Sequence, residues 1–212
     1  STPTKTHFNL IKAIIKKFKI KVLLCEKPFT NNFNEASKIY KLTRRKFKTF
    51  INYPRIIDPS ADILKKKILN SLKFNGNVFY SKSLKNNGSH FINLFIFFFG
   101  NPISLKIISK KKKIFLLNFK KADIKFLKKN NIKTNNFYIE NKDIKIDYRY
   151  SSKNIIIKEK DKKKIIPSFD KKINFNIIKS LESYLLGKKV KLCTMKTALQ
   201  TQKIINEIEK LN

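Results

Sequence analysis

A short apolar strand with helical patterns on both sides is the feature that most constrains this fold. Residues 20–25 (IKVLLC) form a β-branched and leucine-rich run, typical of a strand buried on both faces of a parallel sheet. Apolar residues at helical spacing precede it in His7–Phe18 and follow it in Glu35–Phe47. A second short strand is predicted at Phe50–Tyr53. This order of helix, strand, helix and strand predicts half of a doubly wound α/β domain.

A different pattern follows the boundary marked by Pro54 and Asp58-Pro59. Helices are predicted at Ser60–Leu72 and Asn86–Phe99, with a short strand at Asn77–Tyr80. Beyond them, β-like runs alternate with Lys, Asn and Asp turns, and two helices close the chain. The runs lie at 103–109, 113–119, 136–140, 143–150 and 154–160, and the helices at 173–186 and 197–211. This pattern predicts a meandering, mostly antiparallel sheet with one face in water.

The charge is extreme, because 49 Lys and Arg residues against 14 Asp and Glu give a net charge of +35. Such a charge would suit a nucleic-acid partner. However, only four of these residues are arginine, the side chain that direct base readout favours, and the lysines are spread along the whole chain. AT-rich coding explains this better, so no nucleic acid is expected. A lysine-rich nucleic-acid-binding protein stays open as the alternative from another class.

Cysteine and histidine usage limits the other classes of site. Cys25 and Cys193 form no CxxC pair, and with no signal peptide at the start we expect a reducing cytoplasm. Only two histidines are present, so no metal site is expected. The most apolar run, Phe91–Phe99, is too short to span a bilayer and predicts no membrane segment.

The four glycines exclude a phosphate-binding loop in this chain. No two of them are close enough to form GxGxxG or a P-loop. An α/β half without its opening strand and glycine turn therefore looks cut.

Five segments, in order, carry motifs of one family. They are residues 1–7 (STPTKTH), 22–28 (VLLCEKP), 52–59 (NYPRIIDP), 80–100 and 193–208. They resemble, in that order, the motifs of the glucose–fructose oxidoreductase and inositol dehydrogenase family (Gfo/Idh/MocA). The resemblance implies the C-terminal half of a Rossmann dinucleotide-binding domain in residues 1–54. An open α+β sheet domain with helices on one face would follow in residues 55–212, for substrate binding and oligomerisation. The family's glycine fingerprint would lie upstream of Ser1, so we expect an N-terminally truncated member.

The resemblance also implies a nicotinamide cofactor, NAD or NADP. The residues expected to bind it are Thr2, Pro3, Thr4, His7, Glu26 and Lys27. Glu26 would bond the nicotinamide ribose, and Lys27 would polarise the substrate oxygen or relay a proton. In this family the Lys–Pro bond of the turn is often cis.

The expected catalytic residues are Lys27, His90 and Asn86. His90 suits removal of a hydroxyl proton, because histidine titrates near neutral pH. Asn86 lies four residues earlier, on the same face of the predicted helix, where the family usually has Asp. Arg55 and Asn93 are candidate substrate residues, with a plain ion pair between Arg55 and Asp58 as the alternative.

We therefore expect a cytoplasmic NAD(P)-dependent oxidoreductase that acts on a sugar, a cyclitol or a nucleotide-linked sugar. It would have no membrane contact, and it could form a homo-oligomer through its open sheet. A truncated, inactive member of the same family is the alternative within this class.

Overall fold

The chain folds into two compact units. The computed structural model describes residues 3–130, 135–149, 152–168 and 172–210. The first unit holds the chain up to Ile57 together with Lys172–Lys210, and the second unit holds the segment between them. Within the described residues, none of the helices combines the length and the apolar character that a membrane span needs.

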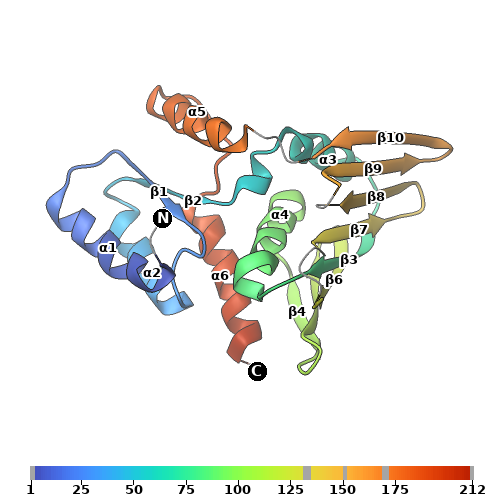
Figure 1. The fold of residues 1–212 in the computed structure, drawn as a ribbon, viewed down its shortest axis with the longest axis horizontal. Helices are drawn as coiled ribbons and strands as arrows, with labels where there is room; N and C mark the ends of the chain where they lie inside the picture. Colours follow the sequence, from blue (N-terminus) through green and yellow to red (C-terminus); the bar gives the residue numbers. More distant parts are fainter. Residues whose placement is uncertain (1–2, 131–134, 150–151, 169–171, 211–212) are drawn as a thin grey trace. The chain divides into compact units, whose positions relative to one another are not determined.

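The first unit is built around two parallel strands (Figure 1). Its elements are α1 (Thr4–Lys17), β1 (Val22–Glu26), α2 (Phe33–Thr43), β2 (Lys48–Asn52), η1 (Pro54–Ile56), α5 (Ile173–Leu185) and α6 (Met195–Lys210). The alternation of helix and strand predicted for the N-terminal segment is confirmed. The pairing runs from Val22 opposite Lys48 to Glu26 opposite Asn52, so both strands end at the same edge.

The two C-terminal helices pack on this first unit. The backbone N–H of Ile51 in β2 donates to the carbonyl of Cys193 at 2.9 Å, just before α6. The ring of Phe50 meets Tyr184 of α5 edge-on, with 5.1 Å between the ring centroids. Gly187 follows α5 with a φ of +78°, and its N–H donates to the carbonyl of Tyr184, as in a glycine that ends a helix. The division of function between residues 1–54 and 55–212 stays a prediction.

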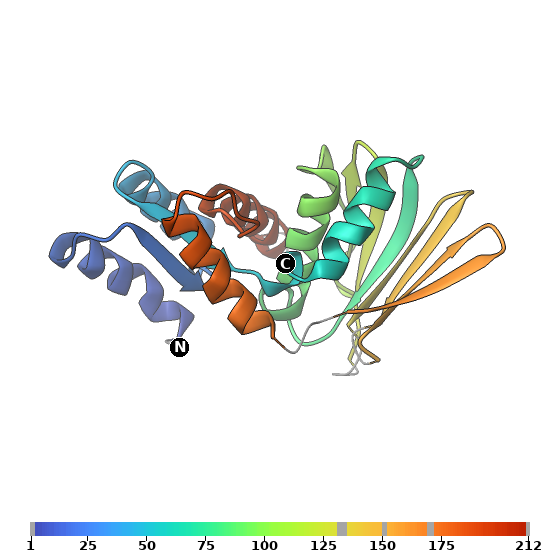
Figure 2. The same cartoon turned by 90° about the horizontal axis from the view of Figure 1, so that it is seen from above.

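The second unit is an open sheet of eight strands in the order β10-β9-β8-β7-β3-β6-β5-β4. Its elements are α3 (Pro59–Leu69), β3 (Phe74–Tyr80), η2 (Leu84–Gly88), α4 (Ser89–Phe99), β4 (Ser104–Ser109), β5 (Ile114–Phe119), β6 (Ala122–Lys128), β7 (Asn136–Glu140), β8 (Ile144–Arg149), β9 (Asn154–Glu159) and β10 (Lys162–Pro167). Only β3 and β6 pair in parallel, so the predicted mostly antiparallel sheet is confirmed. Helices α3 and α4 lie on the same face of it (Figure 2).

Phenylalanine dominates the core between α4 and the sheet. Phe95 of α4 meets Phe137 of β7 edge-on at 5.2 Å between ring centroids. Phe115 and Phe126 stack on neighbouring strands, with centroids 4.7 Å apart and planes 11° apart. Aromatic pairs in these geometries contribute beyond their buried area. The most apolar run of the sequence, residues 91–99, therefore lies in the helix that closes this core.

Candidate functional site

The first cluster of expected site residues stands at the end of β1. Glu26 is the last residue of the strand and is exposed. Its neighbour across the parallel pair is Asn52, whose Nδ2 donates to Glu26 Oε1 at 2.7 Å. Because this bond fixes the carboxylate, Glu26 presents acceptor oxygens at the carboxyl edge of the sheet. Ligands of open α/β folds bind at that edge.

Lys27 occupies a tightly held turn. It is half-buried, and its bond to Pro28 is cis, as the family resemblance implied. In the residues that follow, Thr30 Oγ1 donates to the carbonyl of Asn32 at 2.8 Å, which holds the chain in a turn. The side chain of Asn32 then caps α2 by accepting from the N–H of Glu35 at 2.9 Å. The turn therefore passes from the strand into a capped helix within a few residues.

His7 brings the start of α1 against this turn. Its Nδ1 lies 3.2 Å from the carbonyl oxygen of Pro28 and 3.2 Å from that of Phe29. Pro3 and Thr4 begin the same helical turn, Pro3 exposed and Thr4 half-buried. Two of the expected cofactor-binding segments are thus neighbours, while Thr2 lies outside the described residues.

The second cluster follows the end of β3. The sequence predicted one α-helix from Asn86, but this prediction was wrong at its start. Residues Leu84–Gly88 form a π-helical turn (η2), and α4 begins at Ser89. Bonds in a π turn span five residues rather than four, so the expected alignment of Asn86 with His90 by α-helical spacing does not apply. Asn86 is exposed and His90 is half-buried.

The η2 turn rests on the last residue of β3. Gly88 allows the close approach, because a Cβ there would lie 2.7 Å from Leu84 Cδ1 and 3.3 Å from a ring carbon of Tyr80. Burial raises the pKa of Tyr80 to about 12, so its hydroxyl stays protonated at neutral pH. The segment that carries Asn86 and His90 therefore packs against a buried aromatic ring.

A buried amide network, which sequence reasoning missed, also holds this segment. Asn135 Nδ2 donates to Ser81 Oγ at 2.8 Å, and Asn87 Nδ2 donates to the same oxygen at 3.0 Å. The N–H of Ser81 in turn donates to Asn135 Oδ1. Since the residues lie 54 positions apart, no local pattern could have predicted the pairing. It fixes the chain between β3 and η2.

The two candidate substrate residues are buried side chains. Arg55 of η1 is 8% exposed, and Asn93 in the middle of α4 is fully buried. Their roles in substrate binding stay predictions.

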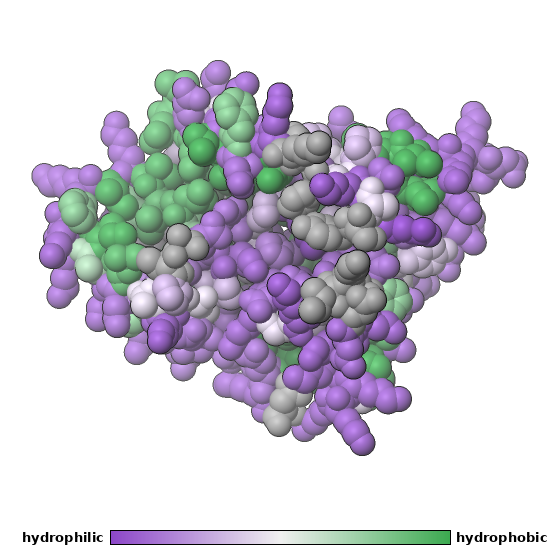
Figure 3. Space-filling model, viewed as in Figure 1, coloured by the Kyte–Doolittle hydropathy of each residue, from purple (hydrophilic) through white to green (hydrophobic). Residues whose placement is uncertain are grey.

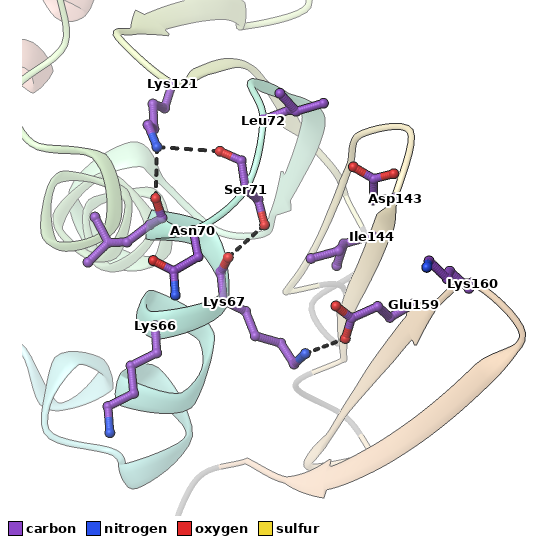
Figure 4. A pocket seen from close by; sticks show the side chains of 11 residues that line it. Lys66, Lys67, Asn70, Ser71, Leu72, Lys121, Asp143, Ile144, Glu159 and Lys160 are labelled. Carbon is purple, nitrogen blue, oxygen red and sulfur yellow. Dashed lines mark hydrogen bonds and ion pairs between the residues drawn. The ribbon is translucent and has the colours of Figure 1, made fainter.

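The second unit also contains a cavity of about 680 Å³ (Figure 4). Residues 69–72, which precede β3, line it, whereas His90 follows the other end of that strand. Lysines from three segments line the cavity, but their ammonium groups do not converge. Lys67 pairs with Glu159, and Lys121 donates to the carbonyls of Leu69 and Ser71. Lys66 points away from both (Figure 4). These contacts hold turns together, so we place no site residue in this cavity.

The fold defines an architectural class: an α/β unit with two parallel strands, of the Rossmann type, and an open, mostly antiparallel sheet unit. Residues 1–53 match the model of the oxidoreductase family with an NAD-binding Rossmann fold, GFO_IDH_MocA. The resemblance to the Gfo/Idh/MocA family is thereby confirmed, and this segment is similar to the family's Rossmann domain. By this resemblance the segment is similar to the NAD-binding domain of oxidoreductases. No curated protein matches the chain.

Solved structures share the fold over nearly all of the chain. One is the UDP-N-acetylglucosamine 3-dehydrogenase GnnA from Acidithiobacillus ferrooxidans, with 12% identity, a TM-score of 0.80, and coverage of 99% of this chain and 76% of that one. Another is the aldose-aldose oxidoreductase from Caulobacter crescentus, with 14% identity and a TM-score of 0.78. The match covers 99% of this chain and 75% of that one. A third is the super-repressor mutant of Gal80p from Saccharomyces cerevisiae, with 11% identity and a TM-score of 0.77. The match covers 99% of this chain and 76% of that one. At such identities the likeness shows the fold alone, so function must be argued from the site.

Proposed function

We propose that this chain supplies the nicotinamide side of a cofactor site and the acid–base residues of an NAD(P)-dependent oxidoreductase. Its substrate would be a secondary hydroxyl or the matching carbonyl of a sugar, a cyclitol or a nucleotide-linked sugar. The observation that carries the proposal is the Glu26–Pro28 turn, held at a carboxyl strand edge beside the start of α1.

The residues present fit the nicotinamide half of the cofactor better than its phosphates. Glu26, oriented by Asn52, offers oxygens to ribose hydroxyls. No glycine-rich turn exists in this sequence to cradle a pyrophosphate. When bound, a nicotinamide would supply the hydride acceptor or donor. Pro3 and Thr4 would lie beside it.

Three side chains would handle the substrate oxygen and its proton. The Lys27 ammonium would stabilise negative charge that develops on that oxygen, or relay its proton. His90 would remove or return the proton, and Asn86 would position the pair. Among the fold's solved structures, those named for UDP-N-acetylglucosamine and for aldoses favour a sugar-like substrate. The net charge of +35 would attract a nucleotide sugar because its phosphates are anionic.

Binding of reduced nicotinamide mononucleotide and of NADH, followed by nicotinamide fluorescence, tests this proposal. We expect the two affinities to agree within about threefold, because the residues that would hold the second nucleotide are not in this chain. Glu26→Ala should weaken both, and Glu182→Ala on α5 should weaken neither. The proposal fails when neither compound binds, or when Glu26→Ala binds them unchanged.

A non-catalytic member of the family is the second candidate. The observation that favours it is Asn86, which is neutral where the family usually has Asp and cannot stabilise an imidazolium in the same way. Asn86→Asp separates the two candidates, since the exposed position tolerates the change. For the enzyme, this variant keeps or raises the turnover of the wild type. For the non-catalytic member, neither the wild type nor Asn86→Asp shows turnover.

A further inference from the structure

His7 is a buried side chain with a defined hydrogen-bonding role. It is only 4% exposed, and its Nδ1 lies 3.2 Å from two backbone carbonyl oxygens, those of Pro28 and Phe29. Carbonyl oxygens can only accept hydrogen bonds, so Nδ1 carries a proton and donates. This assignment fixes the ring's tautomer without reference to any ligand.

The two carbonyls belong to the turn that carries Lys27. Phe29 is 2% exposed, so its carbonyl has little access to water, and a buried backbone acceptor needs a partner. His7 supplies that partner from the first turn of α1, across 21 and 22 positions of sequence. The bond therefore joins the start of the helix to the strand end.

We propose that His7 is a positioning residue that sets the place of Lys27 through the backbone of Pro28 and Phe29, rather than a direct cofactor ligand. The inference rests on the proposed function for the role of Lys27. The His7 ring donates to the turn, so movement at residues 28–29 requires a buried hydrogen bond to break. Such a bond is costly to leave unmade.

A cysteine–histidine nucleophile is the competing explanation for this cluster, because Cys25 Sγ lies 3.9 Å from His7 Nδ1. Two observations oppose it. Burial, with a smaller contribution from the Glu26 carboxylate, raises the pKa of Cys25 to about 12, so the sulfur stays a neutral thiol. The thiol itself contacts the carbonyl of Glu26 as a donor. Both side chains thus face backbone carbonyls of the same turn.

Three variants at His7 separate positioning from packing. Asn places a donor near the position of Nδ1, Gln places it further out, and Phe keeps a ring without a donor. Hydrogen exchange of the amides in residues 26–31 is the readout, with the melting temperature as a check on folding. We expect His7→Phe and His7→Gln to exchange roughly tenfold faster in this segment, about 1.4 kcal/mol, while His7→Asn stays near the wild type.

Ile11→Val, one turn further along α1 and equally buried, is the matched control. It should lower the melting temperature slightly without a specific effect on residues 26–31. The inference is overturned when His7→Phe and His7→Gln leave exchange there unchanged, or when His7→Asn is no better than His7→Gln. Binding of reduced nicotinamide mononucleotide should weaken in the same order of variants. When the wild type binds none of it, the proposed function fails, but hydrogen exchange still decides the role of His7.

Discussion

The strands β1 and β3 each end in candidate site residues, yet they are supported very differently. β3 pairs with β6 on one side and β7 on the other, and Phe74, Val78 and Tyr80 in it are at most 1% exposed. Within the described residues, β1 pairs only with β2, and Val22–Leu24 are half-exposed. Strands of a parallel sheet are normally covered on both faces.

Exposed apolar side chains occur in both units, and Ile103 of the second unit is 73% exposed. Helix α5 of the first unit presents Phe175, Ile178, Leu185 and Leu186, each more than half exposed. The largest hydrophobic area in Figure 3 lies over the first unit. Strand β3 is thus paired on both sides and buried, whereas β1 has one partner strand within the described residues and partly exposed apolar side chains. Four experiments, from the largest expected effect to the smallest, test this difference.

The chemistry should need both strand ends equally, despite their unequal support. Under the proposed function, His90→Asn and Lys27→Met each lower kcat by about 10²–10⁴, since each removes a proton-transfer or charge-stabilising group. Lys21→Met, at the exposed residue before β1, is the control and should leave kcat unchanged. Steady-state kinetics with sugar and nucleotide-sugar substrates gives the values. A fall in kcat for only one of the two variants would show that the residue at one strand end alone takes part in the chemistry.

Truncation of a core side chain should distinguish the two units. Phe95→Ala removes a fully buried ring that contacts Phe98, Phe126 and Phe137, so we expect a loss of about 3–5 kcal/mol in the free energy of unfolding. Leu24→Ala in half-exposed β1 should cost only about 1 kcal/mol. Urea denaturation measures both. Equal losses would contradict the comparison, because they would mean that β1 is as well covered as the sheet of the second unit.

Alkaline pH should weaken the first unit before the second. The Cys25 thiol, with a pKa raised from 9.0 to about 12, stays neutral in the folded chain but ionises above pH 9 once unfolded. Stability is therefore lost as the pH rises from 9 towards 12, by up to about 1.4 kcal/mol for each pH unit. Tyr80 in β3 acts in the same direction, but only from pH 10 upwards. Cys25→Ala should remove the loss between pH 9 and 10, and Tyr80→Phe should not, as urea titrations at each pH will show.

Backbone strain in turns should make the smallest difference to stability between the units, and among the described residues it destabilises the second unit. All four non-glycine residues with positive φ among the described residues are lysines of the second unit: Lys82, Lys113, Lys153 and Lys160. A side chain there costs roughly 1–2 kcal/mol of steric strain. Lys113→Gly should thus raise the free energy of unfolding by about 1 kcal/mol, with Lys111→Gly in the same turn as the control. A gain from both variants would attribute the effect to lost charge.

Much of this fold follows from local pattern. The helix–strand alternation and most hairpins were predictable because apolar spacing dictates them, and a lysine-rich turn does lie between β4 and β5. Two strands were not named from sequence. β6 alternates apolar residues with charged ones, and β10 begins with three lysines, so neither has a strong apolar run. β6 pairs with β3 and β5, and β10 pairs with β9.

The site was predictable only in part. Residue types at Glu26, Lys27 and His90 were available from motif resemblance, but their surroundings were not. The π turn before α4 depends on Gly88 fitting against Tyr80, and the Ser81–Asn135 bonds join distant segments. The contact of His7 with the Pro28 and Phe29 carbonyls is likewise long-range. Sequence spacing cannot contain such information, because it arises when separate elements pack.

The core of stacked phenylalanine rings has a consequence for how far the sequence of such a chain can change. Phenylalanine buries a large area per residue, so a core assembled from it keeps its volume with few residue types. Substitutions favoured by AT-rich coding could then change most surface residues, provided that stacked pairs such as Phe115 with Phe126 were kept. Only 12% of residues are identical to those of GnnA, at a TM-score of 0.80. The same fold is thus compatible with very different residue types, provided that the interior stays filled.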